Sequence, residues 1–318
     1  MPTVVRLLAV VLGLALLAPL PASADPVDPP LTEPVEALAA ATACDPVDEL
    51  RTAKDVVLLV HGTATTPEES WSWGYERALH ADGFALCTVR LPDFALGNIL
   101  RSAEYVVAAA RTAIELSERR ISIIGHSQGG QLAVWATRFW PGVAAGVHDV
   151  VTLASPLDGT RLGNTLCLLR RCNPVAWQSR RGSQTVAALR RAPVPAGVDT
   201  TALATRYDEI VFPQPAVNDL PGARSILLQR VCASDPVEHN LILGDPVAYA
   251  LAVDAMTHDG PADPARIPRS TCRQLFIPNG DFAGAAAGLS SILRFFVSGV
   301  LDARRFVSAE PPLPAYAQ

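Results

Sequence analysis

A Gly-x-Ser-x-Gly pentapeptide, Gly125–Gly129, constrains the fold of this 318-residue chain more than any other feature. The short apolar run Ile121–Ile124 precedes it, and the residues after it are typical of a helix start. In that strand–turn–helix context the motif predicts a nucleophile elbow, a sharp turn that holds the Ser127 hydroxyl clear at the end of a sheet. The two glycines are needed because a Cβ at either position would collide with the neighbouring strand or helix. The alternative is a small-residue turn that closes an ordinary βα unit, and the flanking pattern favours the elbow.

Strand-like and helix-like segments alternate along the chain. Continuous apolar runs predict buried strands over residues 56–60, 84–89, 121–124, 147–154 and 226–231, and helices are expected over 98–118, from the elbow to about 139, and over 246–256. Such alternation predicts a parallel sheet with right-handed crossovers. Together with the elbow, it predicts an α/β-hydrolase fold, with a central, mostly parallel sheet flanked by helices.

We expect a single catalytic domain over residues 44–318, after a Pro- and Ala-rich extended lead-in over 25–43. Residues 155–197 break the alternation and hold seven arginines, which predicts a cap insertion over the sheet. A solvated surface excursion is the alternative. Residues 283–300 form a late apolar helix, either packed in the core or forming one wall of an apolar substrate pocket.

The N-terminus has the pattern of a signal peptide over residues 1–24. Arg6 precedes an uninterrupted apolar run of eleven residues, and Ala22-Ser23-Ala24 is a small-x-small cleavage site. Eleven residues fall short of the roughly 20 that span a bilayer, so an uncleaved anchor is the weaker alternative. We expect a secreted protein with no transmembrane segment in its mature chain. Its charge would be −6, since the first 24 residues hold one of 26 basic and none of 31 acidic residues, and this argues against a nucleic-acid partner.

Six cysteines in an exported chain predict three disulfides, which fifteen connectivities could satisfy. Cys167 and Cys172 are close enough in sequence to close a local loop. Pairing of near neighbours then predicts the bonds Cys44–Cys87 and Cys232–Cys272. A metal site is not expected, because no paired C-x-x-C spacing occurs.

A serine hydroxyl needs a histidine to accept its proton and a carboxylate to orient that histidine. In α/β-hydrolase folds the chain order is Ser, acid, His. His148 precedes every plausible acid, so His239 is the predicted base and His258 the fallback. His239 follows a predicted strand after a short loop, which is where a base is expected.

The predicted acid is Asp208, which comes directly after the short run Thr201–Ala204. The adjacent Glu209 is the first alternative, and Asp235 and Asp199 are weaker ones. A loop-capping role for Asp208 is the structural alternative to a catalytic one.

An oxyanion hole needs donors aimed at the charge that develops on the carbonyl oxygen. One is expected from the backbone N–H of Gln128, the residue after the serine. The other is expected from Thr63, in the loop after the strand that ends at Val60, where Gly62 permits close approach. His61 precedes the serine and is interpreted as a structural histidine of this turn.

Four segments together resemble the family of Candida antarctica lipase B, and the likeness covers the chain from about Cys44 to its end. The segments are the elbow, Gly62–Thr66, Tyr207–Gln214 and Glu310–Ala317. The resemblance implies a triad of Ser127, Asp208 and His239. It also implies an oxyanion hole of Gln128 and Thr63, with Thr63 using both amide and hydroxyl, and it fits the pairs Cys44–Cys87 and Cys232–Cys272.

The chain also departs from that family. No cysteine follows Cys272, whereas the yeast-type protein has a C-terminal disulfide. The pair Cys167 and Cys172 falls instead in the predicted cap, whose arginines are unlike that family's uncharged lid region. His61-Gly62 stands where the family has Pro-Gly. These departures leave the triad untouched and bear on the pocket, the lid and the substrate preference.

These observations predict a secreted serine carboxylester hydrolase, foremost a triacylglycerol lipase acting on an ester or lipid substrate at an oil–water interface. The alternatives are a short-chain esterase or polyesterase, an acyltransferase with the same triad, and a non-catalytic envelope-binding protein on a hydrolase scaffold. The predicted chemistry requires no metal or organic cofactor. We expect a monomer.

Overall fold

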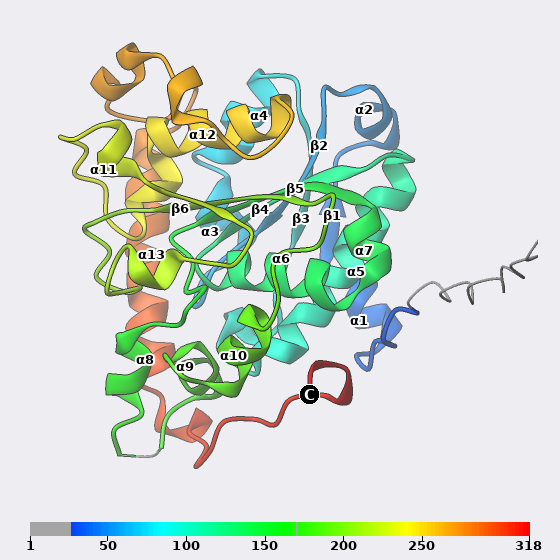
Figure 1. Cartoon of the computed structure of the whole chain (residues 1–318), viewed down its shortest axis with the longest axis vertical. Coiled ribbons are helices and arrows are strands. Elements are labelled where there is room, and N and C mark those ends of the chain that lie inside the picture. Colours follow the sequence, from blue (N-terminus) through cyan, green and yellow to red (C-terminus); the bar gives the residue numbers. More distant parts are fainter. Residues whose placement is uncertain (1–26, 170) are drawn as a thin grey trace, which may run out of the picture.

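The computed structural model describes residues 27–169 and 171–318 (Figure 1). The predicted signal peptide lies outside the described residues. Seven strands form one sheet in the order β1-β3-β2-β4-β5-β6-β7. The strands are β1 (Thr42–Cys44), β2 (Val56–Val60), β3 (Ala85–Val89), β4 (Ile121–His126), β5 (Val147–Leu153), β6 (Asp199–Ala204) and β7 (Arg224–Leu227). Only β1 runs antiparallel to its neighbour, so the predicted mostly parallel sheet is confirmed.

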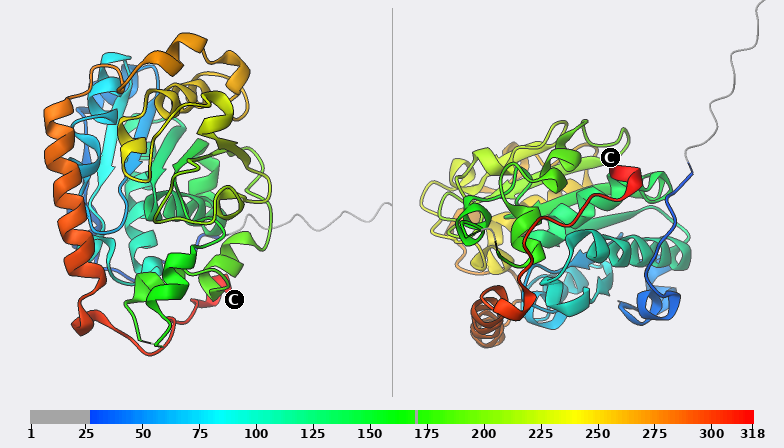
Figure 2. Two further views of the ribbon diagram at one scale, coloured as in Figure 1. Left: turned by 90° about the vertical axis from the view of Figure 1, so that its left-hand side faces the viewer. Right: turned by 90° about the horizontal axis from the view of Figure 1, so that it is seen from below.

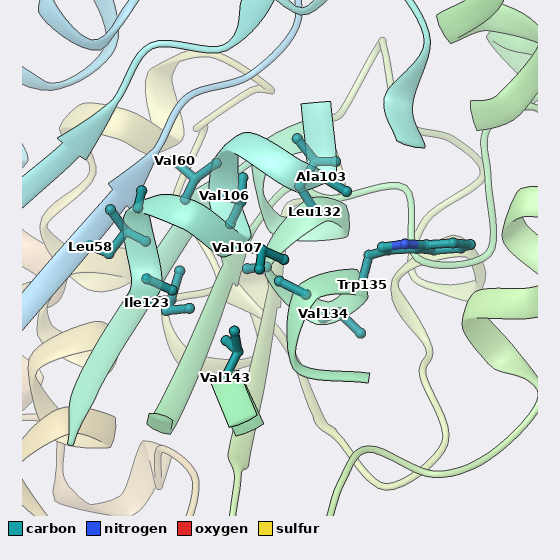
Figure 3. Close-up of a cluster of buried hydrophobic side chains, with 14 of the residues drawn as sticks. Leu58, Val60, Ala103, Val106, Val107, Ile123, Leu132, Val134, Trp135 and Val143 are labelled. Carbon is teal, nitrogen blue, oxygen red and sulfur yellow. The ribbon is translucent and has the colours of Figure 1, made fainter. Parts of the chain in front are cut away.

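Two hydrophobic cores cover the two faces of the sheet. Side chains alternate along a strand, so Leu58 and Val60 of β2 face one core while Val57 and Leu59 face the other. The first core contains α5 (Ile99–Ser117) and α6 (Gln128–Phe139), as Figure 3 shows for their valines and leucines against β2 and β4. The second contains α3 (Pro67–Trp71), α4 (Tyr75–Ala81) and α12 (Pro246–Thr257). Burial on both faces explains the continuous apolar runs of these strands.

The segment between β5 and β6 forms three short helices: α8 (Arg161–Leu166), α9 (Pro174–Ser179) and α10 (Gln184–Arg190). They gather beyond one end of the sheet, beside the C-terminal part of the chain (Figure 1). Asn173 Nδ2 donates to the carbonyl of Val300, which ties the segment to the helix α13 (Phe282–Val300).

Helix α13 runs along one side of the molecule (Figure 2). Gly288 allows its close approach to α3, since a Cβ there would lie 2.8 Å from the carbonyl oxygen of Glu69. Its outer face leaves Phe282, Leu293 and Val297 exposed. In the described part of the chain α13 is the one helix whose length and composition would suffice to cross a membrane, which by itself is weak evidence for a span.

The strand expected over residues 226–231 is wrong in its second half. β7 ends at Leu227, and the chain continues as the helical turn α11 (Leu228–Val231). The reason is the buried Gln229 side chain, whose oxygen accepts the N–H of Arg206 and whose amide donates to Thr205 Oγ1 and to the Asp235 carbonyl. These tertiary hydrogen bonds override the strand preference of the apolar run.

The six cysteines form three disulfides: Cys44–Cys87, Cys167–Cys172 and Cys232–Cys272. The first joins β1 to β3 across the antiparallel edge of the sheet. The second closes the loop between α8 and α9. The third fixes the start of the loop that carries His239, because Cys232 directly follows α11.

Candidate active site

Ser127 occupies a sharp turn between β4 and α6. Its φ of 52° and ψ of −122° lie in a region that a residue with a Cβ rarely adopts. The neighbouring glycines make the turn possible. A Cβ on Gly125 would lie 2.4 Å from the backbone of Gly129, and one on Gly129 would lie 2.1 Å from the carbonyl oxygen of Val60.

Loops that follow β6 and α11 bring Asp208 and His239 to this serine. His239 Nε2 lies 3.1 Å from Ser127 Oγ, and its Nδ1 lies 2.9 Å from Asp208 Oδ1. All three residues are buried. The Asp208 carboxylate is fixed in turn, because Oδ1 accepts the backbone N–H groups of Ile210 and Val211. The arrangement can pass a proton from a serine to a histidine that a carboxylate orients.

The charges around His239 favour its protonated form. Burial alone would lower the pKa of His239, but the Asp208 carboxylate, together with Glu209 and Glu238, outweighs burial and raises it. A raised pKa helps the imidazole to accept the serine proton as the reaction proceeds.

Thr63 and Gln128 line the same cavity as Ser127. Gln128 is the first residue of the twelve-residue helix α6, whose N-terminus favours negative charge. The Gln128 side chain is engaged elsewhere, because its Nε2 donates a hydrogen bond to the Ala95 carbonyl. Only the backbone N–H of Gln128 is therefore considered as an oxyanion donor. Thr63 lies in the loop after β2. In this loop the Ala64 N–H donates a hydrogen bond to the carbonyl of Phe94, which lies in the loop after β3.

The cavity beside Ser127 is mainly apolar. Its walls come from the β5–β6 segment, from the loop after Asp208 and from the end of α13. The apolar lining residues are Pro156, Leu162, Leu166, Val175, Ala176, Ile210, Val211, Phe296 and Val300. Phe296 and Val300 belong to the segment 283–300 that the sequence offered as one wall of an apolar pocket, but the individual lining residues depend on packing between separate segments and were not singled out. The accessible volume is about 60 Å³, so the cavity as it stands has room next to the serine for only the first carbons of an acyl chain.

A further residue missed from the sequence is His126, the first variable position of the elbow motif. It is buried, and its Nε2 pairs with the backbone carbonyl of His239 at 3.0 Å. Burial, together with the charge of His239, lowers the pKa of His126 to about 3. It therefore stays neutral and donates Nε2–H to the loop that carries His239.

The other predicted candidates lie elsewhere. His61 accepts the Leu91 N–H at Nε2 and donates Nδ1–H to the Gly62 carbonyl, and burial lowers its pKa to about 4. His258 contacts Thr257 and Asp254 at the end of α12 and does not contact Ser127.

The alternative acids are also placed away from the His239 ring. Glu209 approaches only the His239 backbone N–H, at 3.5 Å. Asp199 begins β6, at the opposite end of that strand from Asp208. Asp235 accepts the Val237 N–H.

The chain has recognisable relatives, although no protein-family profile matches it. Lipase B of Pseudozyma antarctica is 28% identical over 305 residues, which cover 92% of this chain and 87% of that protein. The crystal structure of Aspergillus fumigatus lipase B is also 28% identical, with a TM-score of 0.84 over 92% of this chain and 74% of that one. The chain has an α/β-hydrolase fold and is similar to these two B-type lipases over most of its length.

This lipase B-like hydrolase is a carboxylic ester hydrolase of the lipase and esterase group. The lipase BlEst2 of Bacillus licheniformis, in its propeptide form, is 16% identical with a TM-score of 0.53 over 70% of this chain and 54% of that one. That likeness concerns the fold alone.

Proposed function

We propose that this lipase B-like hydrolase is a secreted triacylglycerol lipase that acts through Ser127, His239 and Asp208. The observation that carries the proposal is the 3.1 Å approach of His239 Nε2 to Ser127 Oγ beside an apolar cavity. The cavity supports a substrate with a hydrocarbon acyl chain. The three disulfides support export through an oxidising compartment, after removal of residues 1–24.

The reaction would run through an acyl-enzyme. His239 takes the Ser127 proton while Oγ attacks the ester carbonyl carbon, and Asp208 stabilises the resulting imidazolium. The Gln128 amide and the Thr63 amide and hydroxyl hold the oxyanion. His239 then gives its proton to the departing alcohol. Water, activated by the same histidine, releases the fatty acid and restores Ser127.

The β5–β6 segment would serve as a cap that forms part of the acyl-chain pocket. Leu162 and Leu166 of α8 and Val175 of α9 line the cavity and support this role. Phe296 and Val300 of α13, which pack near Leu166, would add to this wall.

A chain-length profile tests the substrate class. Initial rates are measured on p-nitrophenyl esters from acetyl to palmitoyl and on emulsified triacylglycerol, for the wild type and for Ser127→Ala. A lipase hydrolyses long-chain esters and the emulsion well, and the variant hydrolyses none. A preference for acetyl and butyryl esters with no turnover of the emulsion would identify a short-chain esterase or polyesterase instead. Product formation mainly by an added alcohol, in place of water, would identify an acyltransferase.

A further inference from the structure

A second crevice, of about 610 Å³, lies apart from the Ser127 cavity and shares none of its lining residues. We call it the α12–α13 crevice. Its walls come from the starts of α12 and α13, from the turn after Cys272 and from the loop that leads to His239. Its apolar lining includes Leu241, Leu275, Phe276, Phe282, Ala286 and Leu289. Leu241, Leu275 and Phe282 are exposed there, so the crevice offers a hydrocarbon surface to solvent.

Two carboxylates, Asp235 and Asp245, line the crevice together with the polar residues Ser234, Arg273 and Gln274. Asp235 is nine-tenths buried; its Oδ1 accepts the Val237 N–H, but its Oδ2 has no hydrogen-bond partner among the described residues. Asp245 caps α12 through a hydrogen bond from the Ala248 N–H. Burial, and then the neighbouring Asp235, raises the pKa of Asp245 to about 7, so the two carboxylates repel each other.

Among the described residues, no cation pairs with either carboxylate. Arg273 is exposed at the crevice wall and, in the part of the chain that the structure describes, forms no ion pair with either carboxylate. An unpaired buried carboxylate oxygen is costly, and a cation from outside would relieve that cost. Metal binding is disfavoured, because no third acidic, histidine or cysteine ligand joins the pair within the described residues.

We propose that the α12–α13 crevice binds aliphatic ammonium ions, with the ammonium group beside the Asp235 and Asp245 carboxylates and the hydrocarbon tail against Phe276, Phe282 and Leu241. An ammonium group donates three hydrogen bonds and neutralises the carboxylates. The tail contributes binding free energy in proportion to the apolar surface that it buries. The proposal does not depend on the function proposed for Ser127, because the two cavities are separate.

Calorimetric titration of the full mature chain with octylammonium chloride, below its micellar concentration and at about pH 8, tests the proposal. Two matched probes separate its parts: 1-octanol has the tail without the charge, and methylammonium has the charge without the tail. We expect octylammonium to bind at least about tenfold more tightly than either probe. Equal binding of octanol would overturn the role of the carboxylates, and equal binding of methylammonium would overturn the role of the crevice.

Variants locate the site. Asp235→Asn keeps the size of the side chain and its oxygen acceptor for Val237 but removes the charge, and it should weaken octylammonium binding about tenfold or more. Asp199→Asn, an exposed aspartate at the start of β6, is the matched control and should change nothing. Ala286→Trp should abolish binding by filling the crevice, while the Ser127 cavity keeps its lining. Unchanged octylammonium binding in either Asp235→Asn or Ala286→Trp would contradict the proposal. If Asp235→Asn does not fold, Ala286→Trp and the octanol and methylammonium titrations of the wild type still test it.

Discussion

Two histidines at opposite ends of the sheet each lie between polar partners, yet only one of them can accept a proton from a serine. His239 lies near the carboxyl ends of the strands, with Ser127 Oγ at 3.1 Å and Asp208 at 2.9 Å. His148, the second residue of β5, lies near the amino ends. Its Nε2 and Nδ1 lie 3.1 Å from Asp55 and 2.7 Å from Asp149.

The difference lies in the number of carboxylates that each ring contacts. Burial alone would lower the pKa of His148, but hydrogen bonds and charge from Asp149 and Asp55 raise it to about 9. At neutral pH this ring keeps its proton and acts as a fixed cation. His239 has one carboxylate and one hydroxyl, so it has a free acceptor position toward Ser127. A histidine beside a serine and one carboxylate can cycle its proton, whereas one between two carboxylates stabilises the fold.

The largest expected effect separates two buried serines. Ser127→Ala should reduce ester turnover on the order of 10⁶-fold, because it removes the proposed nucleophile. Ser122→Ala removes a hydroxyl that donates to Asp55 at the other end of the sheet and should leave turnover within about threefold. Initial rates on a p-nitrophenyl ester measure both. Residual hydrolysis by purified Ser127→Ala near the wild-type rate would rule out its assignment.

The next effect separates two aspartates. Asp208→Asn should lower kcat about 10⁴-fold, since an amide cannot stabilise the imidazolium or hold the required tautomer. Asp149 contacts the other histidine, His148. Asp149→Asn should therefore change kcat little but lower the melting temperature. Steady-state kinetics and thermal unfolding of both variants make the test. Similar kcat values for the two variants would remove Asp208 from the triad.

A smaller effect distinguishes two threonines of one loop. Thr63→Val should cost about 10²-fold in kcat if its hydroxyl stabilises the oxyanion. Thr65→Val removes a buried hydroxyl that pairs with Ser70 and should affect stability instead. The readout is kcat at saturating substrate. A loss below threefold in Thr63→Val would show that the hydroxyl is not used and leave only its amide as a donor.

The smallest effect concerns stability alone. The folded pKa of His148 is raised to about 9 from an ordinary value of 6.5. Its contribution to the free energy of unfolding is therefore fully present below about pH 6.5 and is lost as the pH rises toward 9. We expect His148→Gln to lose roughly 1–3 kcal/mol at about pH 6 and much less at about pH 9, with kcat unchanged. Chemical denaturation across this pH range measures it, and an equal loss at both pH values would contradict a charged His148.

Local patterns predicted most of the fold. The apolar runs of β2 and β4 and the helical periodicity of α5 are local signals, and the structure confirms them. The strand predicted over residues 226–231 ends at Leu227, because the buried Gln229 side chain forms tertiary hydrogen bonds. No local pattern contains that information.

The candidate site was predictable to a smaller extent. Chain order singled out Ser127, Asp208 and His239 because parallel strands end at one edge of a sheet, and the structure brings these three together. The role of His126 was not predictable, since it depends on a contact across more than 100 residues. Residues 283–300 were offered as a pocket wall, but which residues line the cavity depends on packing between separate segments.

The most direct test of the central claim is covalent labelling of the wild-type protein with a fluorophosphonate, followed by peptide mass spectrometry. The proposed mechanism predicts one adduct, on the peptide that contains Ser127, and its loss in His239→Ala, because the serine needs the histidine to become nucleophilic. Labelling in His148→Gln should match the wild type. The absence of an adduct on Ser127, or equal labelling of His239→Ala and the wild type, would contradict the account.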